Sequence, residues 1–122
     1  NMDNGSGRFR GIYLEENDAA VPFFKEWGKA LESLGFTTLT LRKTSGTDHL
    51  SFIRYGLPAF QFIQDELEYD RTYHTVMDTY ERLSLSDLTV DAAMVAWLGL
   101  NGGMGEKTGP VKPGYPVVEA AR

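Results

Sequence analysis

Three polar clusters in the sequence could take part in catalysis or metal binding. Asp3 lies in Asn-Met-Asp-Asn-Gly, Asp48 and His49 are adjacent in Gly-Thr-Asp-His, and His74 lies in Tyr-His-Thr-Val-Met-Asp. Zinc is satisfied by carboxylate oxygen and neutral imidazole nitrogen at about 2.0 to 2.2 Å, and a further carboxylate can fix the imidazole tautomer. The residue types are therefore those of a metal-dependent chemistry.

The same residues also have ordinary structural interpretations. No two of them form a local metal-binding motif such as His-Glu-x-x-His. An aspartate in an Asn-Gly loop, such as Asp3, is commonly a turn residue, and Asp48 could equally cap a short helix. A single histidine in a polar loop is commonly hydrogen-bonded at the surface. Residue types alone leave both interpretations open.

Composition narrows the chemistry further. The 122 residues include no cysteine, which excludes disulfides, thiolate nucleophiles and cysteine-based zinc sites. The net charge of −5 argues against a nucleic-acid or anionic-membrane binder, because such affinity comes chiefly from clustered Lys and Arg. No apolar run reaches the roughly 20 residues of a membrane-spanning helix, and the N-terminus lacks the pattern of a signal peptide. Peptides, small molecules or cations are the expected ligands.

The elements that must position these clusters follow from hydrophobic patterns. Strands are predicted over 8–14, 36–41 and 59–63, and the last is nearly all apolar, as expected of a strand inside a sheet. Apolar residues at helical spacing predict a helix over 20–34, with Asp18 as its N-cap and Gly35 as its stop. A short helix is expected over 49–55. A final helix should begin at Ser86 or Asp87 and end at 101–103.

The order of these elements predicts an α/β fold. Residues 64–78 are expected to be an extended polar loop leading out of the third strand, where functional residues commonly lie. A sheet of about three strands would leave an apolar edge that invites another strand. The Gly- and Pro-containing segment 104–122 is expected to be a tail after a unit formed by residues 1–103.

Three segments, in this order, resemble motifs of the family-28 zinc peptidases, which include aminopeptidases, glutamate carboxypeptidases and the related glutaminyl cyclases. Asn-Met-Asp-Asn-Gly-Ser-Gly resembles the family segment in which a strand ends at a zinc-binding aspartate. Gly-Thr-Asp-His-Leu-Ser-Phe, followed by Tyr-Gly-Leu-Pro, is similar to the family's Ser/Thr-Asp-His stretch before Gly-x-Pro and a buried strand. Tyr-His-Thr with Asp78 resembles the His-Thr/Ser-x-x-Asp element. The resemblance covers roughly residues 1–101.

The resemblance implies a role for each candidate residue. Asp3 and His74 would be metal ligands, each on a different ion of a two-zinc site. Asp48 would orient groups around the reacting centre, and His49 would support the same loop. Tyr69 would line the substrate pocket. The implied reaction is peptide-bond hydrolysis by a water activated between the zinc ions, with an upstream glutamate moving the proton to the leaving amine.

The resemblance also implies that much of the site is missing. Another histidine ligand, a bridging carboxylate and an adjacent glutamate pair come from family motifs upstream of the one ending at Asp3, and none is in this sequence. The chain is therefore expected to be the C-terminal portion of a zinc exopeptidase domain, part of a three-layer α/β/α fold with a mixed sheet. Alone it should bind zinc weakly and be inactive, since tetrahedral zinc needs three or four ligands.

The implied partners are a peptide substrate in the complete enzyme and the missing N-terminal half of the domain. A second copy could also pair through the exposed sheet edge. Family members are commonly exported, which implies a periplasmic or secreted location. Two other functions stay open: a non-catalytic binding or assembly module on the same scaffold, and acyl transfer of the glutaminyl-cyclase type.

Overall fold

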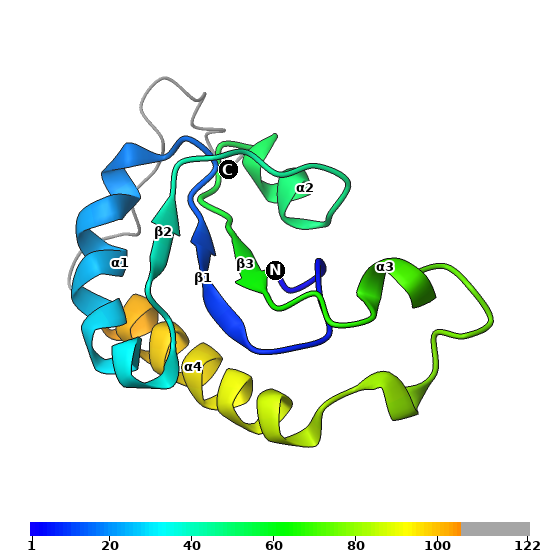
Figure 1. Cartoon of the computed structure of the whole chain (residues 1–122). Coiled ribbons are helices and arrows are strands. Elements are labelled where there is room, and N and C mark those ends of the chain that lie inside the picture. Colours follow the sequence, from blue (N-terminus) through cyan, green and yellow to red (C-terminus); the bar gives the residue numbers. More distant parts are fainter. Residues whose placement is uncertain (106–122) are drawn as a thin grey trace.

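A computed structural model describes residues 1–105 and places a three-stranded sheet at the centre of the chain (Figure 1). The order across the sheet is β2-β1-β3, and β1 pairs with β2 in parallel and with β3 antiparallel. The sheet is therefore mixed, as expected. The strands are β1 (Phe9–Tyr13), β2 (Thr38–Thr40) and β3 (Gln61–Gln64), and the helices are η1 (Asp18–Ala20), α1 (Val21–Gly28), η2 (Lys29–Leu34), α2 (His49–Ile53), α3 (Tyr69–Thr72), η3 (Tyr80–Arg82) and α4 (Leu85–Met104).

A β-bulge in β1 determines which of its side chains enter the core. The register with β3 shifts between Phe9 and Gly11, so Arg10 is the extra residue. A bulge interrupts the alternation of side chains along a strand, and Phe9 and Ile12, three positions apart, are both buried. Arg10 is exposed instead, and its Nε donates to the Asp65 carboxylate at 2.9 Å.

The contact between β1 and β2 depends on Gly11. A Cβ at this position would lie 1.8 Å from the carbonyl oxygen of Thr38, much closer than atoms can approach. Glycine is thus required for these strands to pair at this separation. The two strands are joined by η1, α1 and η2, as in other parallel connections that cross over through a helix.

The predicted helix over 20–34 is confirmed, but it is built from three short pieces over 18–34. Its stop at Gly35 is confirmed by a left-handed φ of +97° and by an amide that donates to the Glu32 carbonyl at 3.0 Å. The expected N-cap was wrong. Asn17 precedes the first turn, Asp18 is its first residue, and no side chain caps it.

Helix α4 begins earlier and ends later than its sequence pattern suggests. Ser84 is the N-cap, and its hydroxyl accepts a hydrogen bond from the Asp87 amide at 3.3 Å. Gly102 and Gly103 lie within the helix and do not end it. Helices α1 and α4 enclose one core with β1, made of Phe9, Ile12, Leu14, Ala20, Phe24, Leu31, Phe36, Met94 and Leu98.

The opposite face of the sheet is approached by the segment that leads into α2. Phe62 of β3 stacks on Phe9 in the core with ring centroids 4.1 Å apart. Its neighbour Gln61 therefore points to the other face, where it contacts the Thr47 hydroxyl at 3.4 Å. The expected α/β class, with helices flanking a partial sheet, is confirmed.

Two expectations about β3 and the segment after it were wrong. The apolar run over 59–63 suggested an inner strand, but β1 takes the central place in the sheet. Asn1 pairs with the outer side of β3: its amino group donates to the Phe60 carbonyl at 2.7 Å, and the Phe62 amide donates to the Asn1 carbonyl at 2.9 Å. The expected loop over 64–78 contains the short helix α3.

The predicted tail over 104–122 lies outside the described residues from position 106 onward, and α4 itself extends to Met104. Within residues 1–105, no helix combines the length and the apolar character needed to cross a membrane.

Candidate functional site

Asp3 and Tyr69, both predicted as site residues, are in direct contact. Asp3 lies in the segment before β1, and Tyr69 is the first residue of α3. The Tyr69 hydroxyl donates to Oδ1 of Asp3 at 2.8 Å. Burial of the phenol, together with this hydrogen bond, raises the pKa of Tyr69 well above its ordinary value. The hydroxyl thus keeps its proton and serves as a donor to the exposed Asp3 carboxylate.

A row of rings connects this pair to His74. The rings of Tyr69 and Tyr73 stack with centroids 5.0 Å apart, and the Tyr73 and His74 rings follow at 3.9 Å. His74 has a φ of +56°, in the left-handed region. Such a conformation costs a non-glycine residue about 1 to 3 kcal/mol, and Glu15, Glu16 and Leu67 share it. Tyr73 is a member of this group that the sequence interpretation missed, although its place next to His74 could have indicated it.

The donors in this group fit zinc in type but not in number. Asp3 supplies a carboxylate and His74 an imidazole, both exposed to solvent. Across residues 1–105, no group of three or more His, Cys, Asp or Glu side chains is close enough to hold a metal ion. A zinc site needs three or four ligands. The described residues therefore do not form a complete site.

Asp48 and His49 belong to a separate place in the fold. Asp48 stands exposed at the start of α2 and makes no side-chain capping hydrogen bond. His49 is buried beside the end of β1, where its Nε2 lies 3.2 Å from Oε1 of Glu15. These neighbours in sequence thus face different surroundings. Within residues 1–105, no hydrogen bond or ion pair joins either of them to Asp3 or His74.

Glu15 is the main feature of this region that the sequence interpretation missed. Its carboxylate accepts hydrogen bonds from the Thr44 hydroxyl at 2.6 Å and from the Thr44 amide at 3.1 Å. Glu15 and His49 are 5% and 3% exposed, so they form a buried polar pair. Sequence patterns showed Glu15 only as the polar end of a strand. Nothing in the sequence links position 15 to position 49.

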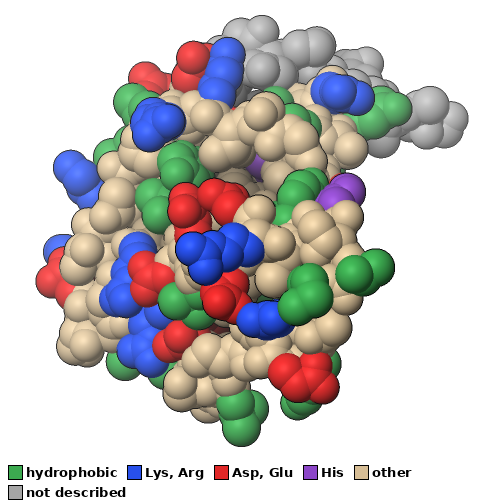
Figure 2. Space-filling view, turned by 45° about the vertical axis from the view of Figure 1, so that its right-hand side comes forward, with side chains coloured by type: hydrophobic (Ala, Val, Ile, Leu, Met, Phe, Trp, Pro, Cys, Tyr) green, Lys and Arg blue, Asp and Glu red, His purple; other side chains and the backbone are tan. Residues whose placement is uncertain are grey.

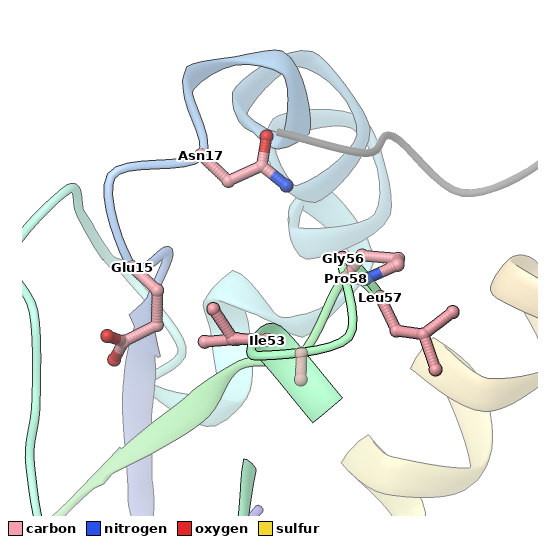
Figure 3. A pocket seen from close by; sticks show the side chains of 7 residues that line it. Glu15, Asn17, Ile53, Gly56, Leu57 and Pro58 are labelled. Atoms are coloured by element: carbon pink, nitrogen blue, oxygen red, sulfur yellow. The ribbon is translucent and has the colours of Figure 1, made fainter. Parts of the chain in front are cut away.

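Beside this pair is a small cavity of about 20 Å³ (Figure 3). The side chains around it come from Glu15 and Asn17 after β1, and from α2 and the turn that follows it. One water molecule needs about 10 to 15 Å³ of such space. The cavity can therefore take a single water but not the side chain of a peptide substrate.

A larger apolar groove of about 360 Å³ lies between the N-terminal segment and α4. Its walls include Met2, Phe9, Leu88 and Val95, with the buried carboxylate of Asp91 among them. Oδ1 of Asp91 accepts a hydrogen bond from the Phe9 amide at 2.9 Å, next to the bulge in β1. Burial raises the pKa of Asp91.

Some of the charged surface side chains form ion pairs. Arg8 lies 3.0 Å from Asp87, and Arg10 and Arg82 pair with Asp65 and Glu68. Figure 2 shows acidic and basic side chains intermingled on one face of the molecule. The net charge of −5 also disfavours polyphosphate binding, which depends on clustered positive charge.

Comparison with protein-family models matches residues 1–98 to Peptidase family M28. Neither the curated proteins nor the solved structures give a match. The matched segment covers most of the chain and contains all three motif segments and the tyrosines between Asp3 and His74. The chain therefore belongs to peptidase family M28, a family of metallopeptidase-type hydrolases.

Proposed function

We propose that this chain supplies one part of the catalytic site of a zinc-dependent exopeptidase, with Asp3 and His74 as ligands of two different zinc ions. The observation that carries the proposal is the contact series from Asp3 through Tyr69 and Tyr73 to His74. It joins two motifs that are about 70 residues apart in a family M28 chain. Two tyrosines separate the two donors, an arrangement that favours separate ions over one shared ion.

Within this site the chain's own residues would orient the ligands. The Tyr69 hydroxyl occupies Oδ1 of Asp3 and leaves Oδ2 for another partner. The Tyr73 ring contacts the His74 imidazole and would limit its orientation. Asp48, exposed at the start of α2, would act on groups that approach from outside the chain. Tyr69 and Tyr73 would form the wall against which a peptide lies.

The remaining ligands and the general base would come from another polypeptide segment, the N-terminal half of the domain. Two surfaces support this partner. β3 pairs on its outer side with Asn1, so that side can accept further backbone. In addition, Leu88 and Val95 of helix α4 line the apolar groove next to Met2. A helix that is apolar on most sides is normally buried on most sides. Alone, the chain is expected not to hydrolyse peptides.

A zinc titration followed by two-dimensional NMR of the ¹⁵N-labelled chain tests the two-ion arrangement. We expect weak, millimolar-range binding that shifts the amide signals near Asp3 and near His74. Asp3→Asn should remove the first set and leave the second, and His74→Ala should do the reverse. Loss of both sets in either variant would contradict two separate ions, and no shifts in the wild-type chain would contradict the ligand assignment.

A second candidate, a non-catalytic assembly module, is favoured by the lack of any three-ligand group within residues 1–105. The two candidates differ in what happens when the N-terminal half of a family M28 domain is added. An exopeptidase part should release amino acids from a peptide panel, and the release should stop with His74→Ala. An assembly module would form the complex without hydrolysis. The family's common export supports a periplasmic or secreted location for the proposed enzyme.

A further inference from the structure

A series of polar side chains, of which Glu15, His49 and Gln61 are buried, crosses the polar face of the sheet from β1 to the N-terminal segment. It begins at the pair of Glu15 and His49. Nδ1 of His49 lies 2.7 Å from the Thr47 hydroxyl, which lies 3.4 Å from Oε1 of Gln61. The same Oε1 accepts from the Asn1 side-chain amide at 2.6 Å. The series therefore ends two residues before Asp3.

The hydrogen-bond donors determine the direction of this series. The Thr44 hydroxyl donates to Glu15 and so can only accept from Nε2 of His49, which lies 3.0 Å away. Nε2 must carry a proton, and that proton also faces the Glu15 carboxylate. With one ring nitrogen committed in this way, the other nitrogen and the Thr47 hydroxyl face each other. Each ring nitrogen of His49 thus contacts a threonine hydroxyl, and the single proton of the Thr47 hydroxyl can be donated either to Nδ1 or to Oε1 of Gln61.

Gln61 is an unusual residue for its position. It is completely buried, and its Nε2 has no hydrogen-bond partner among the described residues. An unpaired buried amide group is destabilising, so an apolar residue would suit this position better if only packing mattered. The contacts of Oε1 with Asn1 and Thr47 give a physical reason for glutamine here.

We propose that His49, Thr47 and Gln61 are positioning residues that hold the segment carrying Asp3 against β3. Glu15 holds the His49 ring, and His49 holds the Thr47 hydroxyl. Gln61 links Thr47 to Asn1, whose backbone pairs with Phe60 and Phe62. The inference rests on the proposed function only where it gives Asp3 a catalytic purpose. The structural coupling can be measured without any metal.

Amide hydrogen exchange in the full chain tests the coupling. The readout is the exchange rate of the Phe62 amide, which donates to Asn1, divided by that of the Leu14 amide, which donates to Thr40 on the other side of β1. Thr47→Val removes the hydroxyl at nearly constant volume, and we expect it to raise this ratio about fivefold, as loss of a net hydrogen bond would. Gln61→Leu should raise it at least as much.

Two further variants separate positioning from general stability. Thr47→Ser keeps the hydroxyl and should restore the wild-type ratio. Thr37→Val, on the exposed segment before β2, should leave the ratio unchanged. An unchanged ratio in Thr47→Val, or equal acceleration of both amides, would overturn the proposal. Because no zinc is present, this result does not depend on the zinc titration, and either proposal can fail alone.

Discussion

The two histidines of this chain lie in opposite surroundings. His49 is buried, and its ring nitrogens face Glu15, Thr44 and Thr47. His74 is exposed, sits in a left-handed backbone conformation and contacts the Tyr73 ring. The polar side chains of the two regions therefore have two different roles, one structural and one in binding. Those around His49 are satisfied by one another and hold the fold, whereas Asp3 and His74 still have capacity for an additional partner.

The largest expected effect comes from removing each histidine in turn. His49→Ala leaves the Glu15 carboxylate buried without its imidazole, and breaking such a pair should lower the free energy of unfolding by about 3 kcal/mol. His74→Ala should change it by no more than about 0.5 kcal/mol, as expected for an exposed side chain. Urea denaturation of both variants measures the difference. Equal losses of unfolding free energy in the two variants would mean that the burial of His49 does not contribute to stability.

A second pair of variants tests whether the stability contributed by a buried carboxylate comes from its negative charge or from its hydrogen bond. Asp91 is buried, and it accepts the Phe9 amide at the bulge. Asp91→Leu leaves that amide without an acceptor and should cost about 1 to 3 kcal/mol. Asp91→Asn keeps an oxygen acceptor and should be close to neutral at pH 7. A similar loss in both variants would indicate that the negative charge, and not the acceptor, is needed.

Asp91 also predicts the sign of a pH effect. Burial raises its pKa in the folded state above the ordinary value of 3.8. The stability linked to Asp91 is therefore fully present below pH 3.8 and is lost as the pH rises through the folded-state pKa. The wild-type chain should lose stability relative to Asp91→Asn over this interval. Denaturation curves at pH 3.5 and pH 7 provide the measurement.

The smallest expected effect concerns Tyr69. Tyr69→Phe removes the hydrogen bond to Asp3 while keeping the ring stack with Tyr73. Because the bond lies near the surface, we expect a stability loss below about 1 kcal/mol. The Asp3 amide signal should nevertheless shift and broaden, while the His49 signals stay in place. Movement of the His49 signals would show that a change at Asp3 is also transmitted back to His49 along the series through Asn1 and Gln61.

The sequence predicted the parts of the fold that rest on local patterns. The strand over 8–14, the helical region ending at Gly35 and the short helix at His49 follow from spacing and glycine chemistry. The start of α4 was misplaced because three candidate caps, Ser84, Ser86 and Asp87, lie within one turn. β3 was placed inside the sheet because residues 59–63 are nearly all apolar. Phe62 packs on Phe9 in the core, and a local pattern cannot separate such burial from burial between neighbouring strands.

The candidate site was only partly accessible from the sequence. Family resemblance indicated Asp3, Tyr69 and His74, and the structure connects them through contacts. Glu15 and Gln61 could not be identified, since their roles depend on which residues the sheet brings together from distant positions. The left-handed φ of His74 was equally out of reach, because no glycine or asparagine marks it.

The strand pairings also have a consequence for the order of folding. β1 and β2 join residues 11 and 38 through one helical connection, while Asn1 meets β3 at residue 61. Closing the longer loop costs more chain entropy and slows the step. The unit of β1, α1 and β2 should therefore assemble first, and the edge carrying Asp3 last. The chain would then have a formed core before the proposed ligand Asp3 is held against β3.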